Sequence, residues 1–246
     1  MARVSVQRSG IALDAPTLVE GFPGVGLVGK IAVDHLVDEC GMVHYANVHC
    51  DGLPAVAAYG SNDTALRTPV RIYADPERAV LALQSDVPVT AAAATEVSDC
   101  LGGWLEEYDV TPVFLSGLPR EKDDEVPSLH GVASGDGDAL LADAGIEAPP
   151  EAGLISGPTG ALLGHAVETG ATAVGLVVES DPQFPDPEAA RILLKDGIEP
   201  LAGVDVPLDD LVEHAEEIRE AKERLAEQMR QAGEESTQAR PLRMYQ

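Results

Sequence analysis

The sequence has 246 residues, of which 16 are Lys or Arg and 42 are Asp or Glu, so its formal net charge at pH 7 is −26. A chain of this length with 45% hydrophobic residues can bury a sizeable core as a folded α/β protein. It offers no basic stripe that would neutralise phosphates, which excludes nucleic acid from the expected partners.

The negative charges are spread along the chain, and only four lysines accompany them: Lys30, Lys122, Lys195 and Lys222. Repulsion within such a surface is largely screened at high salt, because the Debye length falls to about 3 Å at 1 M. We therefore expect a protein adapted to a salt-rich cytosol, with an acidic protein of an ordinary cytosol as the alternative.

Membrane association is not expected. The sequence contains no apolar run of 18 residues, and residues 1–10 lack the apolar core of a signal peptide. These features predict a cytoplasmic protein without a membrane partner.

The cysteines and histidines form no recognisable metal-binding or disulfide pattern. Three cysteines are scattered without a C-x-x-C pair: Cys40, Cys50 and Cys100. Six histidines show no H-x-x-x-H spacing, and three are expected on partly exposed helix faces: His35, His165 and His214. We expect no metal site and no disulfide framework.

Short apolar runs alternate with helical patterns along the chain. Strands are predicted at 18–22, 42–49, 69–74, 79–84, 110–116 and 173–179. Helices are predicted at 25–39, 90–108, 159–169, 187–195 and 208–232, and loops at 121–127 and 145–152. This alternation favours a three-layer α/β fold, in which helices cover a mostly parallel sheet. We expect an α/β domain at 1–206, a C-terminal helix at 207–232 and a flexible tail at 233–246.

A glycine-rich stretch between the first strand and the first helix fits two nucleotide-binding patterns. Gly24, Gly26 and Gly29 spell G-x-G-x-x-G, and Lys30 adds most of a P-loop. Asp51 ends the next strand about where a ribose-binding acid would lie. Pro23 before the first glycine, and Ile31 where a P-loop needs Ser or Thr, argue against nucleotide binding. In the alternative interpretation the glycines only allow a tight turn and close packing.

A second glycine cluster, SGPTG at 156–160, opens another apolar helix. Free N–H groups around Gly157 and Gly160 could receive an anion at the helix N-terminus. The preferred interpretation is a turn in which Thr159 caps the helix.

No catalytic residue is predicted. His49, Cys50 and Asp51 are adjacent, but neighbouring strand residues point to opposite faces and cannot all converge on one substrate. Ser116 and Ser156 lack a G-x-S-x-G elbow.

The C-terminal stretch predicts a long helix followed by a flexible tail. Apolar residues and one lysine recur at spacings of three and four, as in a heptad seam: Leu208, Leu211, Ala215, Ile218, Lys222, Leu225 and Met229. The seam could join copies of the chain or pack on its own domain. Beyond Gly233 the sequence is polar and ends in Met244, Tyr245 and Gln246.

Taken together, several motifs resemble the proteasome assembly chaperone family in its archaeal branch, as a haloarchaeal-type protein related to the second eukaryotic proteasome assembly chaperone. They are GFPGVGLVGKIAVDHLVDECG, DGLP, LSGLP, GLISGPTGALLGHAVETG and ESDPQFPDPEAARILL. The resemblance implies an α/β fold similar to the purine nucleoside phosphorylase class. It implies chaperone and proteasome-binding roles without catalysis or a cofactor. A nucleoside- or nucleotide-binding enzyme of the same fold is the alternative.

The resemblance also carries a function over to the last three residues. Met244, Tyr245 and Gln246 match the hydrophobic-tyrosine-any-residue terminus that docks between α-subunits of the 20S proteasome core. One such tail is expected to bind near the millimolar range, because ordering it offsets most of the gain from burying one tyrosine. Several tails on one assembly would add avidity, so we expect a homo-oligomer.

Overall fold

The computed structural model describes residues 3–51, 53–59, 64–120, 126–183 and 185–212. Its strands are β1 (Arg3–Val6), β2 (Thr17–Gly21), β3 (Val43–His49), β4 (Ala58–Tyr59), β5 (Leu66–Arg67), β6 (Val70–Asp75), β7 (Val80–Ser85), β8 (Thr111–Pro119), β9 (Leu129–Ser134) and β10 (Ala173–Ser180). Its helices are η1 (Val25–Leu27), α1 (Val28–Glu39), α2 (Ala91–Glu107), α3 (Gly137–Asp143), α4 (Gly157–Thr169), α5 (Pro187–Ile192), η2 (Leu193–Ile198) and α6 (Glu199–Ala202).

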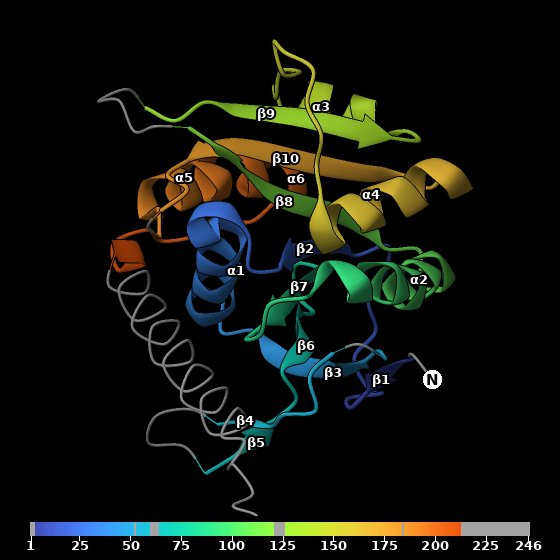
Figure 1. Cartoon of the computed structure of the whole chain (residues 1–246). Helices are drawn as coiled ribbons and strands as arrows, with labels where there is room; N and C mark the ends of the chain where they lie inside the picture. Colours follow the sequence, from blue (N-terminus) through green and yellow to red (C-terminus); the bar gives the residue numbers. More distant parts are fainter. Residues whose placement is uncertain (1–2, 52, 60–63, 121–125, 184, 213–246) are drawn as a thin grey trace, which may run out of the picture.

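Eight strands form one sheet in the order β1-β3-β6-β7-β2-β8-β10-β9 (Figure 1). Its centre is parallel, because β2 pairs in parallel with β7 and β8, and β8 pairs in parallel with β10. The outer strands β1, β3, β6 and β9 add antiparallel pairs at both ends. The predicted α/β class with a helix-covered sheet is confirmed, and the sheet is mixed with a parallel centre.

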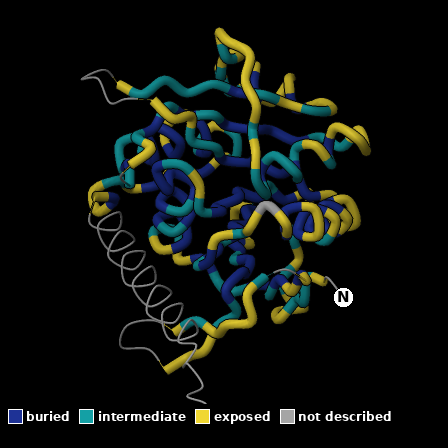
Figure 2. Tube along the Cα trace, in the orientation of Figure 1, coloured by how far each residue is buried: buried dark blue, intermediate teal, exposed yellow. Residues whose placement is uncertain are grey.

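Two apolar clusters fill the space between the sheet and its helices, and the trace through them is buried (Figure 2). Neighbouring residues of β2 enter different clusters. Val19 packs with Ile31 of α1, and Leu18 belongs to the cluster of Leu101 of α2. This alternation follows from the two-residue period of a strand, and it places α1 and α2 on opposite faces. Glu20 therefore points to the same face as Leu18.

All six predicted strands are present, with boundaries that differ by up to three residues. Five further elements were not predicted: β1, β4, β5, β9 and α3. Strands β1 and β9 lie at the ends of the eight-stranded sheet, where each pairs on one side only and needs no long apolar run. The helix predicted at 187–195 continues as α5, η2 and α6 through Ala202.

The predicted terminal helix at 208–232 and the tail at 233–246 lie almost wholly outside the described residues. Of the helix, only its beginning is described, and there Leu211 is buried in the cluster that contains Ile31. Leu208 packs against the same cluster. The start of the predicted seam is thus in contact with the chain's own core.

Candidate functional site

The glycine-rich stretch lies at the carboxyl end of β2, next to the carboxyl ends of β8 and β10, the edge where open α/β sheets commonly bind ligands. Gly26 has a φ of +60°, which favours glycine. Its carbonyl accepts a hydrogen bond from the Asp186 N–H at 2.9 Å. A Cβ added to Gly26 would lie 1.9 Å from the Ser180 Oγ. The turn is therefore packed tightly against the end of β10 and the loop beyond it.

Glu20, at the end of β2, is the central buried polar residue of this edge, and the sequence analysis did not single it out. Its side chain is fully buried. Its carboxylate accepts hydrogen bonds from the Phe22 N–H at 2.6 Å, the Leu115 N–H at 3.3 Å and the Thr159 hydroxyl at 3.0 Å. Burial raises the pKa of Glu20 from 4.5 to about 7, and the three donors offset only part of that effect.

The preferred interpretation of Thr159 as the cap of α4 is wrong. The helix begins at Gly157 with Ser156 in the N-cap position, and Ser156 makes no capping hydrogen bond with its side chain. Thr159 lies within the first turn and donates its hydroxyl to Glu20 across 139 positions of sequence. The hydroxyl faces inward because α4 covers the sheet face to which Glu20 points, so a buried carboxylate takes it instead of the helix end.

Glu20 thus places a carboxyl group beside the first turn of α4, where a helix favours anions, and its raised pKa of about 7 means that it gains its full negative charge only above neutral pH. Two main-chain N–H groups and one hydroxyl near the glycine clusters are directed at this internal carboxylate. A phosphate approaching these donors would meet the Glu20 carboxylate already bound to them.

Lys30, in the first turn of α1, forms ion pairs with two carboxylates. Its Nζ lies 2.7 Å from Asp34 and 3.5 Å from Asp86, and its side chain is 14% exposed. Asp86 also pairs with Arg71 at 2.5 Å, and Gln84 donates to Asp34 at 2.8 Å. Lys30 is therefore neutralised within a half-buried network that joins α1 to β6 and β7.

Asp51 does not take the position that a dinucleotide fingerprint requires. In that fingerprint the ribose-binding acid follows the parallel strand beside the first one. Here β3 is separated from β2 by β6 and β7, and it pairs antiparallel with β6. The spacing along the sequence matches the fingerprint, but the strand order does not.

Ser180 and Asp186 also belong to this edge; the motif ESDPQFPDPEAARILL contains both residues, but no individual role was predicted for either. The Ser180 hydroxyl is buried and has no hydrogen-bond partner among the described residues. Asp186 is 2% exposed and accepts bonds from the N–H groups of Asp181 and Ala189, both at 3.1 Å. Asp186 thereby caps α5 and shapes the loop that covers Gly26.

We expect Gly26→Ala to lower the free energy of unfolding by about 1–3 kcal/mol, because a Cβ strains the left-handed backbone and crowds Ser180. Gly24→Ala is the matched control, since Gly24 has an extended backbone and a Cβ there meets nothing within 4 Å. Urea unfolding at constant high salt measures both variants. Equal effects for the two would contradict the packing role of Gly26.

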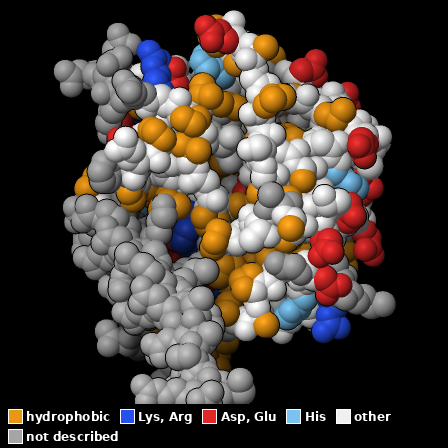
Figure 3. All heavy atoms as spheres, viewed as in Figure 1, with side chains coloured by type: hydrophobic (Ala, Val, Ile, Leu, Met, Phe, Trp, Pro, Cys, Tyr) orange, Lys and Arg blue, Asp and Glu red, His pale blue; other side chains and the backbone are white. Residues whose placement is uncertain are grey.

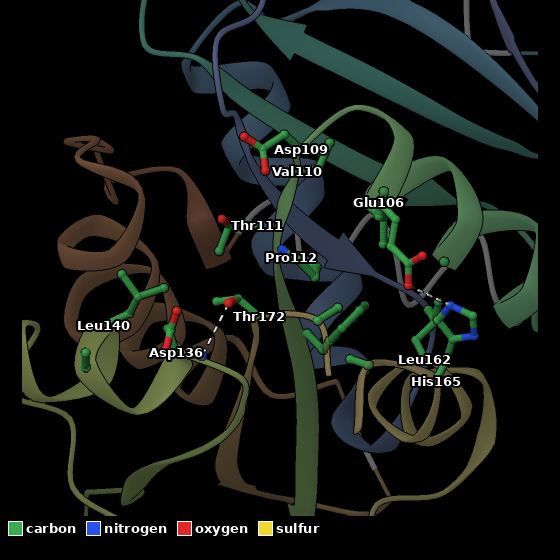
Figure 4. Close-up of a pocket in the computed structure, with 16 residues that line it drawn as sticks. Glu106, Asp109, Val110, Thr111, Pro112, Asp136, Leu140, Leu162, His165 and Thr172 are labelled. Atoms are coloured by element: carbon green, nitrogen blue, oxygen red, sulfur yellow. Dashed lines mark hydrogen bonds and ion pairs between the residues drawn. The ribbon is translucent and has the colours of Figure 1, made fainter. Parts of the chain in front are cut away.

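A cavity of about 530 Å³ lies at the opposite end of the parallel strands, between α2, α3 and α4 (Figure 4). In Figure 4, Glu106 and His165 point toward each other from α2 and α4, and their nearest atoms are 3.3 Å apart. The Asp136 N–H donates to the Thr172 hydroxyl at 3.2 Å. Within the described part of the chain, the cavity lining contains no Ser, Cys, Lys or Arg. The lining therefore combines acidic and apolar side chains without a nucleophile of those types.

His35 is fully buried, contrary to the expectation of a partly exposed face, and its Nε2 lies 2.6 Å from the Pro207 carbonyl oxygen. Pro207 therefore contacts His35 just before the C-terminal segment, in which the first helical residue is Leu211. Among the described residues, no group of three potential ligand side chains forms a metal site. Met244, Tyr245 and Gln246 lie outside the described residues.

The surface is acidic where α2 and α4 end, as Figure 3 shows by the Asp and Glu side chains gathered on that side. No helix within the described segments is long and apolar enough to cross a membrane. The mixed sheet with its parallel centre and the helices on both of its faces define the class: a three-layer α/β protein.

Within that class, the chain belongs to the PAC2 family, whose sequence model matches residues 18–226. This confirms the membership predicted from the motifs. An uncharacterized protein of Methanocaldococcus jannaschii is 25% identical over 233 residues, which cover 91% of this chain and 90% of that protein.

Two solved structures from Pyrococcus furiosus share the fold. PbaA, described as an archaeal homolog of proteasome-assembly chaperone, aligns with a TM-score of 0.80 at 23% identity, covering 94% of this chain and 99% of PbaA. PbaB, described as an archaeal proteasome activator, aligns with a TM-score of 0.69 at 21% identity, covering 92% of this chain and 98% of PbaB.

Proposed function

We propose that this protein is a cytoplasmic, proteasome assembly chaperone-like protein that binds the 20S proteasome core, or its free α-subunits, through Met244, Tyr245 and Gln246. The observation that carries the proposal is the hydrophobic-tyrosine-any-residue sequence on a chain of the PAC2 family. The descriptions of PbaA and PbaB, which both refer to the proteasome, support the choice of partner.

In this mode, Met244 fills an apolar niche, Tyr245 packs its ring against the pocket wall and the terminal carboxylate of Gln246 pairs with a lysine. High salt screens the carboxylate–lysine attraction, whereas salts that are excluded from protein surfaces strengthen apolar burial. Met244 and Tyr245 therefore contribute more of the affinity than the terminal charge does.

The proposal is tested by pull-down of the matching proteasome core, and of free α-subunits, in multimolar salt. We expect Tyr245→Ala to weaken binding by about 10-fold to 100-fold, because burying one tyrosine contributes about 1.5–3 kcal/mol. Deletion of the last three residues removes binding. Tyr59→Ala is the matched control, since Tyr59 is 78% exposed on β4 and far from the terminus in sequence.

Undiminished binding by the deletion variant would exclude the tail as the docking element. Failure of the intact chain to bind either the core or the α-subunits would overturn the proteasome assignment itself.

The proposal includes a homo-oligomer, since one weak tail gains occupancy when several tails engage one ring of α-subunits. Light scattering in high salt is expected to give the mass of two or more chains of 25.7 kDa each. A strictly monomeric protein would require a tail that binds tightly on its own.

The alternative, a nucleoside- or nucleotide-binding enzyme, is less well supported. The donors near the glycine clusters are directed at Glu20, and Lys30 is paired with two carboxylates. A rise in melting temperature with a nucleoside or nucleotide would favour this alternative.

A further inference from the structure

Two of the three cysteines, far apart in the sequence, meet in the folded chain. Cys50 follows β3, and Cys100 lies in α2, which covers this part of the sheet. The Cys100 Sγ lies 3.9 Å from the carbonyl oxygen of His49, the residue immediately before Cys50. Both residues belong to the apolar cluster beneath α2. Both are free thiols, and Cys40 is in the other cluster, on the face of α1.

The two thiols differ in exposure and in acidity. Cys50 is 8% exposed, whereas Cys100 is half-buried. The hydrogen bond from Cys50 holds the pKa of the Cys100 thiol below its usual range, and the same bond raises the pKa of Cys50. Since the thiolate is the reactive species, Cys100 is the more reactive of the pair.

We propose that Cys50 and Cys100 form a redox modification site, at which a small-molecule disulfide converts the two thiols into an intramolecular disulfide. Neighbouring sulfurs are required for this reaction, and the fold supplies them without a C-x-x-C motif. The bond would tie the end of β3 to α2. It would also fix the start of the segment that leads to β4 and β5.

The reaction proceeds by thiol–disulfide exchange. The Cys100 thiolate attacks one sulfur of the small disulfide, forms a mixed disulfide and releases one small thiol. Cys50 then loses its proton and attacks the Cys100 sulfur, which forms the Cys50–Cys100 bond and releases the second small thiol. The protein loses two electrons and two protons, and the small disulfide is reduced to two thiols.

The experiment treats the full-length folded chain with oxidised glutathione and counts free thiols after denaturation. We expect the wild type to fall from three thiols to one, with a protein mass lower by two hydrogens. Cys40→Ser is the matched variant, and it should fall from two thiols to none. Trypsin should then yield peptide 31–67 linked to peptide 79–120, a link that only Cys50 and Cys100 can form in this variant.

The same cross-link can be mapped in the wild-type protein. Chymotrypsin cleaves after Tyr45 and so puts Cys40 and Cys50 on different peptides, which shows which of the two is linked to Cys100. Cys50→Ser should stop at a mixed disulfide with glutathione on Cys100. The oxidised protein should unfold at a higher denaturant concentration than the reduced protein, because a cross-link constrains the unfolded chain. Retention of both thiols in Cys40→Ser, or links only between separate chains, would overturn the proposal.

Discussion

Gly160→Ala is expected to destabilise the protein by about 2–4 kcal/mol. A Cβ at Gly160 would lie 2.2 Å from the main-chain oxygen of Ile155 and 2.7 Å from its carbonyl carbon. A backbone carbonyl cannot turn aside as a side chain can, so the first turn of α4 has to move. Overpacking of this kind costs about 1–3 kcal/mol, and losing the Thr159 hydrogen bond to Glu20 adds about 1 kcal/mol.

Gly164→Ala in the same helix is the matched control. Gly164 is exposed, and a Cβ there meets nothing within 4 Å. Alanine favours a helix over glycine by about 0.5–1 kcal/mol, so this variant should be slightly more stable than the wild type. Urea unfolding at constant high salt compares the three proteins. A Gly160→Ala variant as stable as Gly164→Ala would show that α4 does not depend on its close approach to Ile155.

Glu20→Gln is expected to remove a pH dependence of stability that lies between about pH 4.5 and 7. The pKa of Glu20 is about 7 in the folded protein and 4.5 when unperturbed, so in this interval the folded state keeps a proton that the unfolded state has lost. The contribution of Glu20 to the free energy of unfolding is therefore full below pH 4.5 and is lost as the pH rises through 7. At 1.36 kcal/mol per pKa unit, the difference is about 3 kcal/mol.

The wild type and Glu20→Gln are compared by urea unfolding at pH 5, 6, 7 and 8. The other carboxylates titrate in both proteins, so they cancel in the difference. We expect the free energy of unfolding of Glu20→Gln, relative to that of the wild type, to rise by about 3 kcal/mol as the pH increases. Glu151→Gln, at an exposed position, is the control and should follow the wild type at every pH. A difference between wild type and Glu20→Gln that stays constant with pH would contradict the raised pKa.

The central strands and the main helices were predictable because their signals are local. A strand buried on both faces, such as 173–180, needs a continuous apolar run, and such a run is visible in the sequence. The edge strands β1 and β9 were missed because one-sided pairing leaves their sequences short and partly polar. The wider sequence pattern also sufficed for the family assignment.

The polar centre of the site was not predictable in this way. Glu20 looked like an ordinary strand residue, and Thr159 looked like a helix cap. Their hydrogen bond depends on α4 being laid over the end of β2, which no local spacing records. The strand order likewise removed Asp51 from the position that its sequence spacing suggested.

The sequence by itself therefore determined the α/β class, most of the elements, the acidic charge and the terminal Met-Tyr-Gln motif, because composition, periodicity and short motifs act within a few residues of one another. Only the tertiary structure decided that Thr159 donates to the buried Glu20 and that Cys100 lies beside the end of β3, next to Cys50. Those contacts join segments far apart in the chain. They arise because each helix must bury its apolar face against a particular strand pair, and that packing sets which distant side chains meet.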